Sequence, residues 1–478
     1  MSRHGDLRRY WKDQLYSNVP EYLSSASKIN GVISAFNSNI DAILPMTGER
    51  LACLINQHNF NIESLLDESV RRIDTPLDLF RGIVRCFKRG IAEEWLIYSE
   101  ETYKWISDVL GYERLQMGGQ CGIVANVSAV AGCQNVYVHC ASLPESQAKL
   151  FLPLNNLKSF DKDGQLVRAC DATRDDLPLI HWIIEFAKGD VLALGEHKIV
   201  CPKSNRFIAT FDPLNLTLTI DPQFRVQNHP YSLVVLSGYH MLTHDLPDGS
   251  KSEDRIKDSL KVIESWKQKE CLVHLEIAST QDEVVRKQVL DLVGTSGLID
   301  SSGLNERELV DCLMVVGEQE LGNDIDRHTD AAHAFAGLVK LFELTQIARI
   351  QLHMFGLYIT IQKKNFTVSP ERNRNGMLLA AICAASKAGT GALDDHESLL
   401  WSLYNDFNGP ASHSLKEFEL LFSILSANYG VSDDFLQTGI AELKDFDVIA
   451  VPTVLVANPK TLVGMGDTIS SMSLIGTY

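Results

Sequence analysis

Near the C-terminus, a glycine-rich turn leads into an aspartate that could act as a base. The segment Gly464–Asp467 follows the apolar run Asp447–Val456 and precedes a small-residue helical pattern, Thr468–Ser473. Two glycines let the backbone turn sharply, and N–H groups at a helix N-terminus can hold an anion. Asp467 could accept a proton from an attacking hydroxyl, so the turn suits phosphoryl transfer. The alternative is that Asp467 only caps the helix.

Two further motifs could bind a hydroxylated ligand. The segment Met117–Gln120 contains two glycines and opens a helical pattern that continues to Ala131. There the main chain can approach a ligand and Gln120 can donate to it, although a glycine-rich helix entry can also be purely structural. Asn39 and Asp41 end the first predicted strand and share one face of an extended chain. Their side chains suit sugar hydroxyls, but Asn and Asp also commonly form turns.

Two carboxylates are candidates for a magnesium site. Glu276 lies near the end of the predicted strand Glu270–Ile277, on the same face as His274. Glu308 stands one helical turn after Asn305. Magnesium in proteins usually keeps several water ligands, so two such carboxylates could hold it through water. The alternative for Asn305 and Glu308 is a helix N-cap with a capping box.

The elements that must position these motifs are alternating strands and helices. This alternation predicts an α/β sheet with helices on both faces, in which ligands bind beyond the carboxyl ends of the strands. Two regions, at about 50–108 and 159–219, depart from the pattern and could form a second, smaller layer. The predicted strands are Gly31–Phe36, Asn135–Ala141, Arg206–Phe211, Ser232–Leu236, Glu270–Ile277, Arg349–Ile361 and Asp447–Val456, and predicted helices include Ser252–Lys269 and Gln281–Val293.

Length and composition narrow the class of protein. A chain of 478 residues favours one large domain and a smaller one. With 44 basic and 61 acidic residues the net charge is −17, and no basic patch points to nucleic acid. No apolar run approaches the ~18 residues that span a membrane, and the N-terminus lacks the apolar core of a secretory signal, so we expect a cytoplasmic protein. The 10 cysteines include no C-x-x-C pair, which favours reduced, buried thiols over a zinc site.

Five motifs, in order along the chain, resemble the archaeal-type ADP-dependent glucokinase/phosphofructokinase family of ribokinase-like sugar kinases. The resemblance covers essentially the whole chain. It implies a ribokinase-like large α/β domain with a central, mostly parallel sheet flanked by helices, formed by residues 1–45, 105–158 and 220–478. A smaller α/β lid domain would comprise residues 46–104 and 159–219. The five motifs are Ser38-Asn39-Ile40-Asp41, Gly118-Gly119-Gln120, His274-Leu275-Glu276, Gly303-Leu304-Asn305-Glu306-Arg307-Glu308 and Val463-Gly464-Met465-Gly466-Asp467-Thr468-Ile469-Ser470.

The resemblance also implies roles for individual residues. ADP would donate the phosphoryl group and AMP would be released, with Asp467 as the base. Leu462 stands where the family often has a small hydroxyl residue, which leaves one polar contact in doubt. The other implied roles are phosphoryl stabilisation by the Gly464 and Gly466 backbone, sugar contacts from Asn39, Asp41, Gly118, Gly119, Gln120 and His181, a phosphate contact from Arg206, a nucleotide site near His353, Val451 and Met465, and a water-mediated site for Mg²⁺ or another divalent cation at Glu276 and Glu308.

The identity of the sugar depends on the lid. In the family a lid glutamate favours glucose, and Ala92-Glu93-Glu94 lies at a suitable distance before Gly118, with Glu94 as the candidate. The alternative is that these acids only form a solvated helical face. Lys188 and Arg206 could meet a sugar phosphate instead, a pairing that suits arginine. The sequence therefore predicts a dual enzyme that phosphorylates fructose 6-phosphate at O1 and glucose at O6, as a monomer or small homo-oligomer without membrane or nucleic-acid partners. A glucose-only kinase, an ATP-dependent ribokinase-type enzyme and a non-catalytic sugar or nucleotide sensor are the alternatives.

Overall fold

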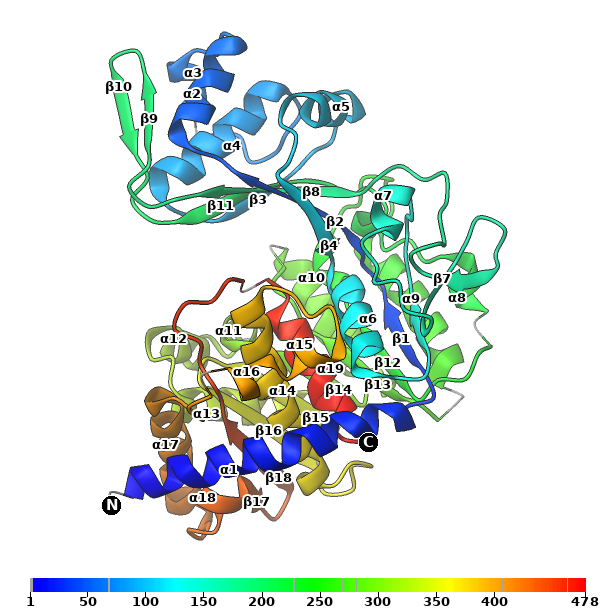
Figure 1. Cartoon of the computed structure of the whole chain (residues 1–478), viewed down its shortest axis with the longest axis vertical. Coiled ribbons are helices and arrows are strands. Elements are labelled where there is room, and N and C mark those ends of the chain that lie inside the picture. Colours follow the sequence, from blue (N-terminus) through cyan, green and yellow to red (C-terminus); the bar gives the residue numbers. More distant parts are fainter. Residues whose placement is uncertain are drawn as a thin grey trace.

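Two β-sheets organise the chain. The structure is a computed structural model, and it describes residues 3–478 except 68, 227, 268–269, 281, 406 and 462, so Leu462 lies outside the described residues. One sheet has 11 strands and the other has five, with a two-stranded hairpin beside it. In Figure 1 the smaller sheet and its helices stand above the larger part of the molecule, and both chain termini lie in the larger part.

The large sheet is parallel in its middle and antiparallel at both edges. Its strands are, in spatial order, β17 (Ile440–Glu442), β18 (Phe446–Pro452), β16 (Leu357–Lys363), β15 (Arg349–Met354), β14 (Ser301–Leu304), β13 (Leu272–Glu276), β12 (Leu233–Leu236), β1 (Val32–Ala35), β5 (Val136–Val138), β6 (Leu157–Phe160) and β7 (Leu166–Arg168). Every neighbouring pair from β15 to β6 is parallel, whereas β16, β17, β18 and β7 pair antiparallel. Strands buried on both faces, such as β1 and β12, consist mainly of apolar residues, as parallel strands covered by helices do.

Helices cover the large sheet, and three of them meet at the catalytic turn predicted from the sequence. α19 (Met465–Ile475) packs against α14 (Pro370–Thr390) and α6 (Gln120–Ala131). A Cβ on Gly376 of α14 would lie 1.9 Å from the carbonyl oxygen of Ser473, so only glycine allows this close approach. The remaining helices of this part are α1 (Arg3–Ser24), α7 (Glu145–Ala148), α8 (Pro222–Arg225), α9 (Ser252–Lys267), α10 (Glu283–Gln288), α11 (Glu306–Val315), α12 (Gln319–Arg327), α13 (Ala331–Leu344), α15 (His396–Leu399), α16 (Trp401–Tyr404), α17 (Ser412–Tyr429) and α18 (Phe435–Thr438), with a π-helical turn at Val289–Gly294.

The small sheet has one apolar face and one polar face. Its strands are, in spatial order, β3 (Glu93–Leu96), β11 (Asn205–Phe211), β8 (Ile180–Phe186), β2 (Asn39–Pro45) and β4 (Arg114–Gly118). Trp182, Phe207 and Ala42 belong to a separate hydrophobic core under α2 (Gly48–Gln57), α3 (Ile62–Leu65), α4 (Pro76–Arg89) and α5 (Glu100–Val109). Because side chains alternate along a strand, Asp41 and His181 fall on the opposite, polar face, where their strands pair them. The hairpin β9 (Val191–Leu194) and β10 (His197–Val200) extends from this sheet (Figure 1).

The predicted α/β alternation is confirmed, with two corrections. Asn39 and Asp41 do not end the first predicted strand but lie in β2, a separate strand of the small sheet. The run Arg349–Ile361 is not one strand but the antiparallel hairpin of β15 and β16, which turns at Gly356 with a φ of 95°. Gly356 was the local signal of this turn, because a glycine inside a strand pattern often marks a bend or a bulge. All 10 cysteines are free thiols, and eight of them are buried. Among the described residues no helix is long and apolar enough to cross a membrane.

Sheet membership differs from the predicted domain boundaries at two places. β6 and β7 pair within the large sheet, although residues 159–219 were assigned to the lid. β2 and β4 belong to the small sheet, although residues up to 45 and from 105 were assigned to the large domain. These two strands run between the two parts of the molecule in Figure 1. That the small sheet acts as a lid stays a prediction.

Candidate active site

The glycine-rich turn forms the N-terminus of α19, and Asp467 is not its cap. Gly464 is the N-cap residue in the left-handed conformation, with a φ of 63°, and no side chain of the described residues caps the helix. The first N–H groups of a helix lack intrahelical partners, so this end can meet an anion. Asp467 lies in the first turn and is only 6% exposed. Burial raises the pKa of Asp467, although the charge of Lys387 and a hydrogen bond from Gln120 lower it.

The N-terminus of α6 meets the N-terminus of α19 at this point. Gly119 is the N-cap residue of α6, and a Cβ there would lie 2.6 Å from the carbonyl oxygen of Asn37. Gln120 follows, within hydrogen-bonding reach of Asp467. Its Oε1 atom is buried and has no hydrogen-bond partner among the described residues. An acceptor is therefore available beside the predicted base.

Asn39 and Asp41 lie directly over Gly118. The antiparallel pairing of β2 with β4 places Asn39 opposite Gly118 and Asp41 opposite Gln116. Asn39 Nδ2 donates a hydrogen bond of 2.9 Å to Asp41 Oδ1. A Cβ on Gly118 would stand 2.2 Å from Asp41 Oδ1, so a side chain at this position would displace the pair. Burial raises the pKa of Asp41, against the lowering effect of His181.

His181 and Glu94 extend this polar group across the small sheet. His181 Nε2 lies 3.0 Å from Asp212 Oδ2. Burial lowers the pKa of His181, but the hydrogen bond and charge of Asp212, with Glu94 and Asp41, outweigh burial and bring the pKa to about 8. The Thr210 hydroxyl donates a hydrogen bond of 2.6 Å to Glu94 Oε1. Glu94 lines a cavity of about 560 Å³ that also touches residues after β12 and β13.

Arg206 is not part of this group. It lies on the same face of β11 as Thr210, but an offset of four positions corresponds to about 13 Å along a strand. Its side chain is exposed and lines a different cavity together with Glu185 and Met46. Lys188 is exposed beyond the end of β8. The structure does not bring the predicted phosphate contacts to the sugar residues.

Glu276 and Glu308 are buried carboxylates on the other side of Asp467. Burial, and then the charge of Asp467, raise the pKa of Glu276 well above its usual value. Glu308 Oε2 accepts a hydrogen bond of 2.8 Å from the Asn305 N–H, and Asn305 caps α11 in return, so the capping box exists. Burial and Asp467 nevertheless raise the pKa of Glu308 to about 8. A Cβ on Gly303 would lie 2.3 Å from Glu276 Oε2, so glycine leaves room for this carboxylate.

These carboxylates fit a divalent cation that is held largely by other ligands. Asp467, Glu276 and Glu308 are buried close together and repel one another when ionised. A nearby cation would stabilise the ionised form of each carboxylate. Within the described residues no group of three or more His, Cys, Asp or Glu side chains could hold a metal ion by itself. Mg²⁺ usually combines one or two carboxylates with water and phosphate oxygens, which matches this donor set.

The predicted nucleotide residues fall into two kinds of environment. His353 Nε2 lies 3.7 Å from Glu276 Oε1, and a Cβ on Gly466 would lie 3.0 Å from the same nitrogen. Burial lowers the pKa of His353 to about 4, so its ring is neutral at pH 7. Met465 opens α19 and is partly exposed. Val451 is fully buried in β18, so its side chain is not available to a ligand.

Several functional candidates were not found from the sequence. Lys387 comes from the buried helix α14 and reaches the catalytic turn. A lysine at the end of the apolar run Met377–Ala385 was a signal, because a charged side chain is rarely buried without a partner. The others are Gln116, Thr210, Asp212 and His240, which surround the sugar candidates, and Arg349, a fully buried cation near Glu276.

Known proteins resemble the chain over almost its full length. A family model described as the ADP-specific Phosphofructokinase/Glucokinase conserved region matches residues 30–476. The chain is 30% identical to an ADP-dependent glucose/glucosamine kinase of Pyrococcus furiosus, over 98% of both proteins. It is 28% identical to an ADP-specific phosphofructokinase of Methanosarcina acetivorans, over 94% of this chain and 93% of that protein. A solved structure described as an ADP-dependent kinase complex with fructose-6-phosphate and ADPbetaS has a TM-score of 0.80 and 26% identity, and covers 98% of this chain and 97% of that one. This likeness confirms the predicted fold class.

Proposed function

Because the chain belongs to the ADP-specific phosphofructokinase/glucokinase family, we propose that it transfers the β-phosphoryl group of ADP to a sugar hydroxyl and releases AMP. Its products are fructose 1,6-bisphosphate from fructose 6-phosphate and glucose 6-phosphate from glucose, as in glycolysis. The observation that carries this proposal is the position of Asp467, buried between the uncapped N-terminus of α19 and the polar face of the small sheet. A cytoplasmic location and a monomer or small homo-oligomer stay predictions.

Asp467 acts as the base in this proposal. The acceptor hydroxyl gives its proton to the carboxylate, and its oxygen bonds to the β-phosphorus while the bond from that phosphorus to the bridging oxygen breaks. The bridging oxygen leaves with AMP. The N–H groups at the start of α19 face the transferred phosphoryl group and stabilise its negative charge. Gln120 orients both the carboxylate and the hydroxyl, since its amide reaches Asp467 and its Oε1 atom has no other partner among the described residues.

Glu276 and Glu308 would hold Mg²⁺ through water. When bound, the ion neutralises part of the charge on the phosphates of ADP. Glu308 keeps its place through the capping box, in which Oε2 accepts a hydrogen bond from the Asn305 N–H. His274 contacts Glu276, with Nε2 at 3.3 Å from Glu276 Oε2.

Glucose recognition has the stronger geometric support. Glu94 is exposed to the cavity and is held by Thr210 in the same polar group as His181 and Asp41. Arg206, the candidate contact to a sugar phosphate, lies about 13 Å further along its strand. A glucose-only kinase is therefore the second candidate, and fructose 6-phosphate would need either the long Arg206 side chain or a closing movement of the small sheet.

A donor and acceptor panel tests the proposal. ADP, ATP and pyrophosphate are each assayed with glucose and with fructose 6-phosphate, with Mg²⁺ and after chelation. We expect turnover with ADP, loss of turnover after chelation, and AMP as the product. Turnover with ATP alone would reject the ADP dependence, and inactivity with fructose 6-phosphate alone would leave the glucose-only kinase.

A further inference from the structure

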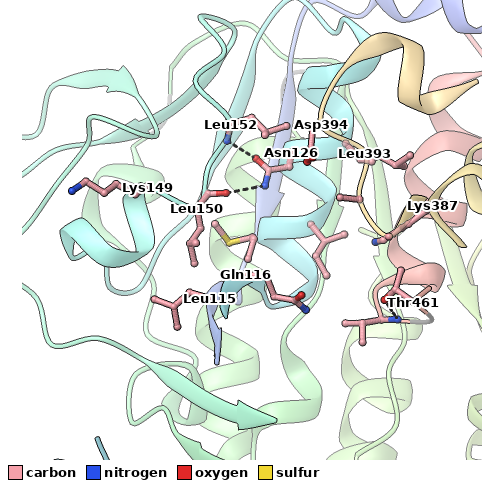
Figure 2. A pocket seen from close by; sticks show the side chains of 16 residues that line it. Leu115, Gln116, Asn126, Lys149, Leu150, Leu152, Lys387, Leu393, Asp394 and Thr461 are labelled. Carbon is pink, nitrogen blue, oxygen red and sulfur yellow. Dashed lines mark hydrogen bonds between the residues drawn. The ribbon is translucent and has the colours of Figure 1, made fainter. Parts of the chain in front are cut away.

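A buried lysine reaches the catalytic turn from α14. Lys387 lies near the C-terminal end of α14 and is only 9% exposed. Its side chain lines a cavity of about 320 Å³ between α6 and the turn that precedes α19. Figure 2 shows Lys387 beside Thr461 on one wall of this cavity, with Asn126 and Lys149 on the opposite side.

The ammonium group of Lys387 is bound to the backbone of the turn. Lys387 Nζ donates to the carbonyl oxygen of Gly464 at 2.8 Å and to Thr468 Oγ1 at 3.1 Å. The Gly464 oxygen also accepts from Thr468 Oγ1 at 2.9 Å and from the Thr468 N–H at 3.2 Å. Three donors therefore converge on one carbonyl oxygen and fix its direction.

Fixing this carbonyl also fixes the N–H group that follows it. In a planar trans peptide the C=O of one residue and the N–H of the next point in opposite directions. Because the Gly464 oxygen is held toward α14, the Met465 N–H points away from α14. That N–H is among the uncapped donors at the start of α19.

Gly464 makes this approach possible. Its φ of 63° is a conformation that other residues rarely adopt. A Cβ on Gly464 would also lie 2.9 Å from Lys387 Nζ and 2.6 Å from Ile123 Cδ1. Lys387 can therefore approach the turn this closely only because residue 464 is a glycine.

Lys387 also brings positive charge to a strongly acidic protein. The chain has a net charge of −17, and Asp467, Glu276 and Glu308 add local negative charge where a phosphate must bind. Burial lowers the pKa of Lys387 to about 8, although Asp467 raises it, so the ammonium form prevails at pH 7. Its charge therefore opposes the repulsion between Asp467 and an incoming phosphate.

We infer that Lys387 is a positioning residue for phosphoryl transfer: it holds the Gly464 carbonyl so that the Met465 N–H faces the β-phosphoryl group of ADP. The inference rests on the proposed function. Lys387 does not touch the sugar or accept a proton, and it acts through the backbone of the turn.

The test compares three variants with the wild-type protein. Lys387→Met removes the charge and the donors at similar length, and Lys387→Arg restores both. Lys149→Met is the matched control, because Lys149 lines the same cavity but is exposed and pairs with Glu145 at 2.5 Å. Turnover is measured at saturating ADP and sugar, and dissociation constants for ADP and for AMP are measured by calorimetry. Melting temperatures show whether each variant is folded, and Lys387→Gln replaces Lys387→Met if the latter does not fold.

We expect Lys387→Met to lower kcat by about 10²-fold, the lower end of the range seen when one hydrogen-bond donor to a developing charge is lost. Its affinity for ADP should fall while its affinity for AMP, which lacks the β-phosphoryl group, stays unchanged. Lys387→Arg should recover most of kcat, and Lys149→Met should resemble the wild type. A folded Lys387→Met or Lys387→Gln protein with wild-type kcat and an unchanged ratio of ADP to AMP affinity would overturn the inference. Inactive wild-type protein would instead reject the proposed function.

Discussion

The hydroxyl of Thr210 on β11 donates a hydrogen bond of 2.6 Å to Glu94 Oε1 on β3. This bond orients a carboxylate on the polar face of the small sheet, where His181 and Asp41 also lie. Glu94 remains exposed to a cavity of about 560 Å³. An oriented carboxylate that still faces solvent is arranged to accept hydrogen bonds from sugar hydroxyls.

Glu94→Ala should weaken glucose binding. Losing a charged hydrogen-bond acceptor in a binding site costs about 1.5–3 kcal/mol, so we expect KM for glucose to rise by about ten-fold or more. KM for ADP should not change, because Glu94 lies on the sheet that faces the sugar. Steady-state kinetics with both substrates measure this. Glu185→Ala, at the far end of the same sheet face, is the control, and an unchanged KM for glucose in the Glu94 variant would remove this residue from the sugar site.

Gly118→Ala should disrupt the sugar site without affecting the nucleotide. The added Cβ would lie 2.2 Å from Asp41 Oδ1 and 2.4 Å from Asn39 Nδ2, so both side chains must move. We expect kcat/KM for either sugar to fall by about ten-fold or more, since misplaced positioning groups cost about that much or more. Calorimetry with ADP should give the wild-type affinity. Gly294→Ala, where the nearest atom to the new Cβ is 3.6 Å away, should behave as the wild type.

Asp467→Asn should lower catalytic activity without lowering the stability of the protein. The carboxylate is buried and its pKa is raised, so the ionised form costs folding free energy at neutral pH. We expect kcat to fall by about 10²–10⁴-fold, the range for a positioned base, while the melting temperature stays equal or rises. In the wild type, kcat should decline as the pH falls through this raised pKa, because a protonated carboxyl cannot accept the hydroxyl proton. Asp394→Asn, at an exposed position near Lys387, should leave kcat unchanged, and near-normal turnover of the Asp467 variant would reject the base.

Mg²⁺ should stabilise the protein more at high pH than at low pH. The pKa of Glu308 is raised from 4.5 to about 8, so its stabilising contribution is complete below pH 4.5 and is lost as the pH rises through 8. The ionised carboxylate that appears over this range is the form that holds a cation through water. We therefore expect Mg²⁺ to raise the melting temperature more at pH 8.5 than at pH 5.5.

Glu308→Gln separates this effect from the capping box. Glutamine at this position can still accept from the Asn305 N–H, so the helix start is retained while the charge is lost. The variant should be less pH-dependent in its melting temperature and should show a smaller response to Mg²⁺. An equal Mg²⁺ response in the variant and the wild type would place the ion elsewhere.

The sequence by itself determined the chemistry that each motif could perform. Side-chain type and short spacing are local properties, so Gly464–Asp467 predicted an anion-binding turn with a base, and Asn39 with Asp41 predicted a polar strand end. The alternation of β-branched runs and helical patterns predicted the α/β class for the same reason. The run that became β15 and β16 shows the limit, because strand-forming residues on both sides of Gly356 do not distinguish one long strand from two paired strands.

The tertiary structure decided which of these groups meet. Gln120 and Asp467 are brought together because α6 and α19 pack side by side with their N-termini at the same edge of the sheet, and Lys387 joins them from α14. Arg206 does not join the sugar candidates, because its position on β11 lies about 13 Å along the strand from Thr210. Strand order, register and helix packing bring together residues that are distant along the chain. Such contacts cannot be predicted from the local periodicity of the sequence.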